Sequence, residues 1–274
     1  MDEYPWETER LDLDAYLARI GVNALAPSRA ALGELLEAHV RTFTFDNIDV
    51  LLDQHPGVAL ADVQSKFVGR GRGGYCFEHS TLLSAALQRL GYQLERRLGR
   101  VADPVTKART HMVVVVAMEG EELLADPGFG LSTIRPVRLA DGVEDDNMGW
   151  PLQVRAVNEG AGRSWEVHRW GQDGWDYLYT IDHLPVRPVD IVHGHHMTST
   201  FPSSLFRHNL MIAGHVGQRH LTVTHQTLTV RVAGEPTDHH DIELTDIPDL
   251  LRELRVPLID DEEQRLLQRV AGLR

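Results

Sequence analysis

The sequence contains a single cysteine, Cys76, among 274 residues. One thiol excludes an internal disulfide framework, and it excludes a zinc ribbon or iron–sulfur cluster built from several thiolates of one chain. A chain of this length can bury a hydrophobic core without such cross-links. The cysteine usage therefore predicts a reducing, cytoplasmic setting.

Positive charge and long apolar runs are also scarce. The formal net charge is −13 and lysine occurs only at Lys66 and Lys107, so we expect no general nucleic-acid partner. The longest purely apolar run, residues 112–118, is far shorter than the about 20 residues that a membrane-spanning helix needs. Residues 1–22 are acidic and amphipathic, unlike a signal peptide. We therefore expect no membrane partner, while the oligomeric state stays open.

The first ninety residues show helical periodicity. Apolar residues at helical spacing over 11–21 end at Gly21, and Ser28 is a candidate N-cap for the next helix. Further amphipathic stretches cover residues 59–69 and the segment that begins at Cys76. This part of the chain is predicted to be helical.

Strand patterns follow Gly91. Alternating or β-branched residues predict strands over 93–101, 111–118, 122–125, 151–158, 163–170 and 175–179. From about Pro185 the pattern is mixed, with a helix predicted around 203–212, strands within 220–234 and a closing helix within 261–272. This order predicts an α+β fold in three parts, residues 1–92, 93–184 and 185–274.

Cys76 stands directly after a glycine-rich turn and begins a predicted helix. The amide groups at a helix N-terminus favour a thiolate and can also hold an oxyanion. Gly73 and Gly74 allow the tight turn that such a placement needs. A buried structural thiol explains Cys76 alone equally well.

Two further residues favour a nucleophilic role. A catalytic thiol needs an imidazole to take its proton, and the imidazole needs a third group to orient it. His111 opens one predicted strand and Asp126 closes the next, with a short turn at residues 119–121 between them. A hairpin through this turn would bring His111 and Asp126 to the same end of the ladder. The order Cys–His–Asp therefore favours a thiol-nucleophile site.

These motifs resemble the arylamine N-acetyltransferase family. The resemblance rests on RGGYCFE at 72–78, on the His111 strand and on DPGFG at 126–130. FDNI at 45–48 is similar to the family's Phe-Glu-Asn-Leu block, and PSSLF at 202–206 is similar to a Ser-rich block. Together these motifs cover nearly the whole chain in order and length.

The resemblance implies both a fold and a reaction. The implied fold is an N-terminal helical bundle (1–92), a central antiparallel β-barrel (93–184) and a C-terminal α/β lid (185–274), with a cysteine-protease or transglutaminase-like core. The implied reaction is ping-pong acetyl transfer from acetyl-CoA, through a cysteine thioester, to an aromatic amine or hydrazine. It requires no metal or prosthetic group.

The resemblance also implies roles for individual residues. Cys76 would be the acylated nucleophile, His111 its base and Asp126 the group that orients the imidazole. Two aromatic residues would line the acceptor pocket, Tyr75 and Phe129. Five residues would lie near coenzyme A: Thr110, Gly130, Ser203, Ser204 and Phe206.

Three other readings remain open. Transglutaminase-like and papain-like hydrolases also place a Cys at a helix start, followed by His and Asp or Asn, and would need no coenzyme A. Some relatives in the resembled family close macrolactam rings from an acyl thioester. The histidines at 193–196 and 239–240 could suggest a non-enzymatic metal binder, but no H-E-x-x-H pattern accompanies them.

Overall fold

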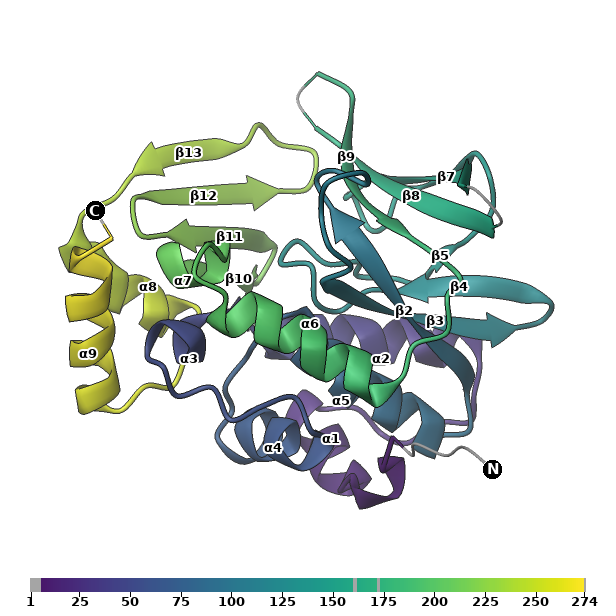
Figure 1. Cartoon of the computed structure of the whole chain (residues 1–274), viewed down its shortest axis with the longest axis horizontal. Helices are drawn as coiled ribbons and strands as arrows, with labels where there is room; N and C mark the ends of the chain where they lie inside the picture. Colours follow the sequence, from purple (N-terminus) through teal and green to yellow (C-terminus); the bar gives the residue numbers. More distant parts are fainter. Residues whose placement is uncertain (1–5, 160–161, 172, 274) are drawn as a thin grey trace.

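The structure, a computed structural model, describes residues 6–159, 162–171 and 173–273. Its elements follow the predicted order of helices, an antiparallel sheet and a second sheet with helices (Figure 1). The α+β class predicted from the sequence is confirmed.

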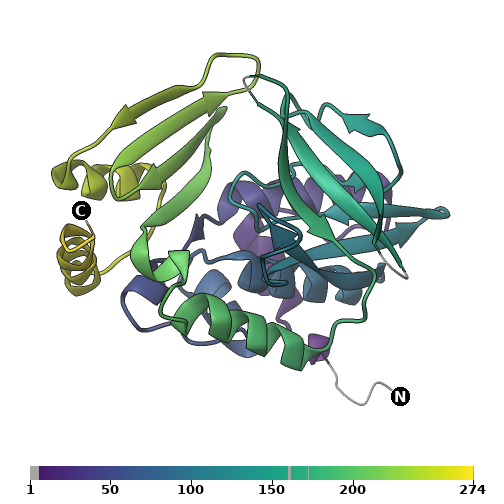
Figure 2. The ribbon, with the colours of Figure 1, turned by 45° about the horizontal axis from the view of Figure 1, so that its top comes forward.

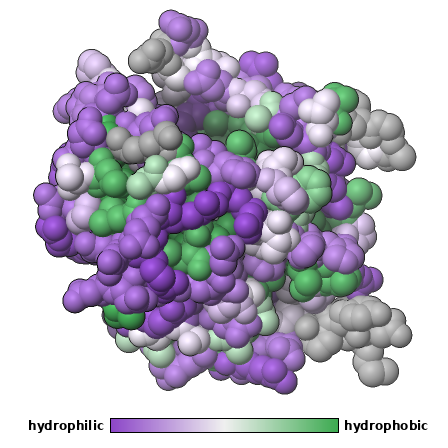
Figure 3. Space-filling view, turned by 60° about the vertical axis from the view of Figure 1, so that its left-hand side comes forward, coloured by the Kyte–Doolittle hydropathy of each residue, from purple (hydrophilic) through white to green (hydrophobic). Residues whose placement is uncertain are grey.

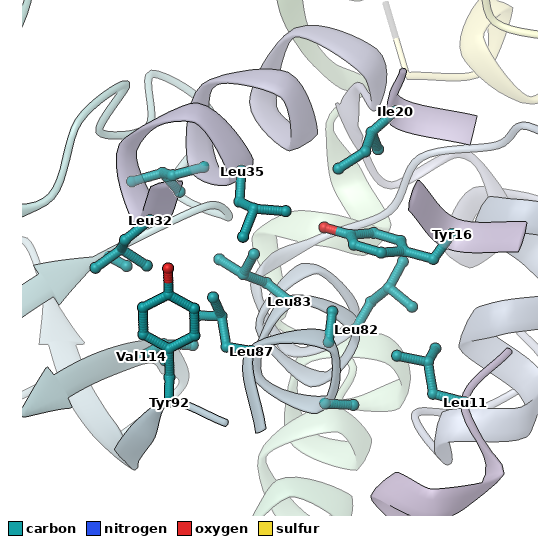
Figure 4. Close-up of a cluster of buried hydrophobic side chains, with 14 of the residues drawn as sticks. Leu11, Tyr16, Ile20, Leu32, Leu35, Leu82, Leu83, Leu87, Tyr92 and Val114 are labelled. Atoms are coloured by element: carbon teal, nitrogen blue, oxygen red, sulfur yellow. The ribbon is translucent and has the colours of Figure 1, made fainter. Parts of the chain in front are cut away.

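The helical part packs around one hydrophobic cluster. Its predicted ends are confirmed, since Gly21 has φ 73° and the Ser28 hydroxyl accepts a hydrogen bond from the amide of Ala31. Leucine and tyrosine side chains from three helices meet in this cluster (Figure 4). The elements are a 3-10 turn Thr8–Arg10, α1 (Leu13–Ile20), α2 (Arg29–Thr42), α3 (Ile48–Leu51), α4 (Leu60–Gln64), a π-helical turn Ser65–Gly69 and α5 (Cys76–Arg89).

The central part is one eight-stranded antiparallel sheet, curled into a nearly closed barrel. The strand order is β5-β4-β3-β2-β9-β8-β7-β6. All six predicted strands are present, and two short strands, β5 and β6, were not predicted. The strands are β2 (Gln93–Val101), β3 (His111–Met118), β4 (Glu121–Ala125), β5 (Val137–Arg138), β6 (Val143–Asp145), β7 (Leu152–Glu159), β8 (Gly162–Trp170) and β9 (Trp175–Ile181).

The third part surrounds a five-stranded sheet of order β1-β10-β11-β12-β13. Its first strand, β1 (Phe45–Asp46), comes from the helical part, so the division into three parts at 92/93 and 184/185 stays a prediction. The remaining elements are α6 (Pro188–Thr200), α7 (Leu205–His208), β10 (Met211–Val216), β11 (Arg219–Thr224), β12 (Thr227–Val232), β13 (Asp238–Asp241), a 3-10 turn Leu244–Asp246, α8 (Ile247–Glu253) and α9 (Asp260–Ala271).

One prediction in this part was wrong and one helix was missed. The helix expected around 203–212 is only the single turn α7, because Met211 already lies in β10 and pairs with Thr224. The missed helix is α6, which spans the front of the molecule between β9 and α7 (Figures 1 and 2). Its Gly, Thr and Val residues have low helix propensity, but Pro188 at its first turn and Asp190, which accepts from the amide of Arg187, start it.

The surface is mainly hydrophilic. On the face that carries α8, α9 and β13, hydrophobic residues form patches between broad hydrophilic areas (Figure 3). None of the described helices is both long and apolar enough to cross a membrane.

Candidate active site

Cys76 is the first residue of α5, and backbone pairing fixes the turn before it. The amide of Gly74 donates to the carbonyl of Thr44 (3.1 Å), and the amide of Asp46 donates to the carbonyl of Gly74 (2.7 Å). A Cβ at Gly73 would lie 1.9 Å from the Thr44 oxygen, and one at Gly74 would lie 2.2 Å from a Glu78 carboxylate oxygen. Both positions therefore require glycine.

A buried ionic network holds the start of α5. Glu78 accepts from the amide of Tyr75 (3.1 Å) and from the ammonium of Lys66 (2.8 Å). Lys66 also contacts Asp49 (3.0 Å), which binds the guanidinium of Arg72 (2.8 Å). Burial would raise the pKa of Glu78, but Lys66 and His55 together outweigh it and lower that pKa to about 2. The charged residues that flank Cys76 thus support the turn rather than face the thiol.

The imidazole and the carboxylate meet beside the thiol. The pairing of Val114 with Ala125 puts His111 and Asp126 at the same end of the β3–β4 hairpin. Nε2 of His111 lies 2.9 Å from Oδ2 of Asp126, and Cys76 is close enough to His111 to raise the pKa of its imidazole. The predicted juxtaposition of these three residues is present in the structure.

The loop after Asp126 packs directly on the nucleophile. A Cβ at Gly128 would lie 2.6 Å from the Cα of Cys76, so the DPGFG loop can approach α5 only with glycine here. The amide of Gly128 donates to Oδ1 of Asp126 (3.1 Å). The thiol of Cys76 donates to the carbonyl of Thr110 (3.4 Å), just before β3. Helix, strand and loop therefore converge on the sulfur.

The electrostatics of the site follow from these contacts. Burial would lower the pKa of His111, but the Asp126 carboxylate and the neighbouring Cys76 outweigh it and raise that pKa to about 10. His111 in turn keeps the pKa of Asp126 below its usual value, against the effect of burial. At neutral pH the imidazole is therefore a cation, the partner that a thiolate nucleophile requires.

A fourth residue, Tyr179, hydrogen-bonds to the carboxylate of Asp126. The hydroxyl of Tyr179, on β9, donates to Oδ2 of Asp126 (2.7 Å), and its ring centroid lies 4.7 Å from that of His111. Tyr179 is 1% exposed. Sequence reasoning missed it, because a tyrosine at the end of a strand carries no local signal that it faces a carboxylate 53 residues earlier.

The two aromatic residues predicted for the acceptor pocket have different neighbours. The ring of Phe129 is 5.2 Å from the ring of His111, on the barrel side of the site. Tyr75 is fully buried, with its ring 5.4 Å from that of Phe206 and its hydroxyl bonded to Nδ1 of His195 on α6. Their role in binding an acceptor stays a prediction.

The residues predicted to lie near coenzyme A form two groups. Thr110 is at the barrel end, where its carbonyl accepts from the thiol, and Gly130, in the loop after β4, lies against Phe45 and Ala213 of the second sheet. Ser203, Ser204 and Phe206 surround α7, and the hydroxyl of Ser204 caps that turn by accepting from the amide of Phe206 (3.3 Å). Contact of either group with the coenzyme stays a prediction.

The histidine-rich segments are not loops. Residues 193–196 lie within α6 and residues 239–240 within β13. In the part of the chain that the structure describes, no three or more His, Cys, Asp or Glu residues are placed to hold a metal ion together.

A thiol at a helix start, an imidazole and a buried carboxylate are typical of enzymes that form a covalent acyl-thiol intermediate. Comparison with known proteins narrows this class. A family model described as N-acetyltransferase matches residues 29–256. An arylamine N-acetyltransferase of Mycolicibacterium smegmatis is 33% identical over 243 residues, which are 84% of this chain and 85% of that protein.

Solved structures agree with the sequence relatives. The arylamine N-acetyltransferase of Nocardia farcinica superposes with a TM-score of 0.91 at 30% identity, covering 97% of this chain and 98% of that one. The arylamine N-acetyltransferase of Mycobacterium marinum in complex with CoA superposes with a TM-score of 0.87 at 30% identity, covering 96% and 99%. The chain belongs to the arylamine N-acetyltransferase family.

Proposed function

We propose that this protein transfers the acetyl group of acetyl-CoA to an aromatic amine or hydrazine through a thioester on Cys76. The observation that carries this proposal is the convergence of Cys76, at the start of α5, with an imidazole that is hydrogen-bonded to the buried carboxylate of Asp126 (2.9 Å). The M. marinum relative solved with CoA supports the choice of donor. We further propose that the enzyme works in the cytoplasm, where its single thiol stays reduced.

The reactive form is an ion pair in which the proton of Cys76 resides on His111. In the first half-reaction, this Cys76 thiolate attacks the carbonyl carbon of the thioester. A new carbon–sulfur bond forms at Cys76, the bond to coenzyme A breaks, and the leaving thiolate takes the proton from His111. The backbone amide at Cys76, with no earlier helical turn to bond to, is placed to hold the developing oxyanion. The products are acetyl-Cys76, free coenzyme A and a neutral imidazole.

In the second half-reaction, the amine nitrogen attacks the acetyl carbon. An aromatic amine is weakly basic, so it is neutral at pH 7 and can attack directly. Its proton passes to His111 as the bond to Cys76 breaks, which restores the thiolate and the imidazolium. Asp126 keeps the imidazole in one orientation through both steps, and the aromatic side chains around the site help to exclude water, which would waste the acyl-enzyme.

The test is intact-protein mass spectrometry after brief incubation with acetyl-CoA and a rapid acid quench. We expect one acetyl group on the wild type and none on Cys76→Ala, because the chain has no other thiol. Adding an aromatic amine or hydrazine should discharge the adduct and yield the N-acetylated product.

The other outcomes separate the remaining readings. An adduct that no aromatic amine discharges would contradict the proposed acceptor and favour ring closure on a tethered acyl thioester. No adduct and no release of coenzyme A, together with turnover of peptide or glutamine amides, would replace the proposal with a hydrolase or transglutaminase-like reaction. An acetyl group on Cys76→Ala would overturn the role of the thiol.

A further inference from the structure

A polar cavity lies on the far side of the segment that supports the Cys76 turn. Its volume is about 310 Å³, which is at the small end of the range for ligand sites. It is enclosed by the end of α2, by β10 and by the residues after α8. The lining residues used below are Arg19, Arg41, Thr44, Gly71, His215 and Arg255.

The cavity has an excess of positive charge in a protein whose net charge is −13. Three arginines line it against one carboxylate, Glu253, and that carboxylate is already paired with Arg219 (2.6 Å). Arg41 is paired with Glu37 (2.8 Å). Arg19 donates to the carbonyl of Val68 (2.7 Å). Within the described ranges, neither Arg19 nor Arg255 pairs with a carboxylate. Among the described residues, two of the three guanidinium groups that line the cavity, Arg19 and Arg255, thus lack a carboxylate partner.

An unpartnered imidazole also lines the cavity. Nε2 of His215 is buried and has no hydrogen-bond partner among the described residues, and neither has Nε of Arg169 nearby. Burial lowers the pKa of His215 to about 4, and the charges of Arg41 and Arg169 contribute to that shift. The buried, unpaired Nε2 of His215 is thus a polar atom that still needs a hydrogen-bond partner.

The ends of two helices oppose the positive charge of the cavity without cancelling it. The C-terminal ends of α2 and α8 lie at the cavity, and each carries about half a negative charge. Together they carry less charge than the guanidinium groups of Arg19 and Arg255. Arg255 has φ 57° and directly follows the last turn of α8, the position where glycine is favoured. An arginine there stores local strain, and such strain is typical of functional positions.

We propose that this cavity binds an oxyanion of the phosphate class, either free phosphate or pyrophosphate or the phosphate groups of a coenzyme. Guanidinium groups are the side chains best suited to this chemistry. The occupant would lie against Thr44, whose carbonyl accepts from the amide of Gly74 (3.1 Å) and from Nε2 of His79 (3.1 Å). Occupancy would therefore brace the strand that holds the turn before Cys76. This inference does not depend on the proposed acetyl transfer.

The test is calorimetric titration of the full chain with inorganic pyrophosphate and with inorganic phosphate, in phosphate-free buffer at constant ionic strength. Thermal melting is followed in parallel. We expect saturable binding with one site and a rise in Tm. Arg255→Gly and Arg19→Gln should each weaken binding about tenfold or more, because each removes a charged donor.

The choice of variants distinguishes a loss of oxyanion binding from a loss of folding. Arg255→Gly should fold at least as well as the wild type, because glycine relieves the strain at a positive φ. Arg252→Gln is the matched control: its side chain is 69% exposed, pairs with Asp249 and does not line the cavity. It should bind like the wild type.

Competition with coenzyme A identifies the source of the oxyanion. If pyrophosphate displaces coenzyme A and Arg255→Gly weakens both, the coenzyme's phosphates occupy the cavity. If both bind at once, free phosphate or pyrophosphate is the ligand. Absence of any heat or Tm shift at millimolar concentrations, or an equal loss in Arg252→Gln, would overturn the proposal.

Discussion

Two buried histidines close to Cys76 have opposite electrostatic states. His111 is 3% exposed and its pKa is raised to about 10, whereas His79 is 1% exposed and its pKa is lowered to about 4. Burial lowers the pKa of both. His111 differs because the carboxylate of Asp126 contacts it, so the partner decides which imidazole carries charge.

His79 belongs to a chain of hydrogen bonds between neutral groups, in which all donors point in the same direction along the chain. Its Nε2 faces the carbonyl of Thr44 (3.1 Å), which can only accept, so this nitrogen carries the proton. Its Nδ1 then accepts from Nε2 of His39 (2.9 Å), and Nδ1 of His39 accepts from the hydroxyl of Tyr16 (3.0 Å). The chain braces α1, α2 and α5 without a net charge. One imidazole therefore serves chemistry and the other serves packing.

The variant with the largest expected effect removes the negative charge beside His111. Asp126→Asn keeps the shape of the carboxylate but removes its negative charge and replaces one acceptor oxygen with an NH2 donor. We expect kcat/KM to fall by about 10³–10⁴-fold, with a near-native melting curve as the control for folding. A rate within a few-fold of the wild type would show that another group orients His111.

A smaller effect is expected from a matched pair of tyrosines. Tyr179→Phe removes the hydroxyl that donates to Asp126, and a hydrogen bond to a charged group is worth about 1.5–3 kcal/mol, so we expect kcat/KM to fall about tenfold or more. Tyr16→Phe removes the hydroxyl that donates to His39 and leaves a buried acceptor unpaired, which should reduce the free energy of unfolding by about 1–3 kcal/mol.

The two variants should therefore lose different properties, Tyr179→Phe the reaction rate and Tyr16→Phe the stability. Steady-state rates measured per folded enzyme should be near wild type in Tyr16→Phe and low in Tyr179→Phe. Equal losses of rate in both would mean that the neutral chain also shapes the reacting groups.

The sequence predicted the parts of the site that depend on local pattern. Cys76 was found from its glycine-rich turn and helix start, and His111 and Asp126 from the ends of one hairpin, where the register follows from a short turn. Tyr179 and His195 could not be found in this way, because strand β9 and helix α6 reach the site only through the tertiary fold. The helix α6 itself was missed because packing, and not propensity, stabilises it.

Per pH unit, the smallest expected effect is on the pH dependence of stability. The folded pKa of His79 lies below the ordinary value of about 6.5, so the unfolded state binds more protons between about pH 6.5 and 4, and stability falls as the pH is lowered. The folded pKa of His111 lies above that value, so its contribution is complete below pH 6.5 and is lost as the pH rises towards 10. Urea unfolding at a series of pH values measures both, with each imidazole contributing at most about 1.4 kcal/mol per pH unit.

Substitution shows what each of these two imidazoles contributes to the profile, and other histidines with pKa values lowered by burial, such as His215, share the acid side. His79→Gln, which keeps a donor for Thr44, should flatten the acid side relative to the wild type and leave the alkaline side unchanged. His111→Gln should flatten the alkaline side only, because it removes the proton that Asp126 retains in the folded state. If His111→Gln instead flattened the acid side, His111 would be neutral in the resting enzyme, and the thiol of Cys76 would have no cation beside it.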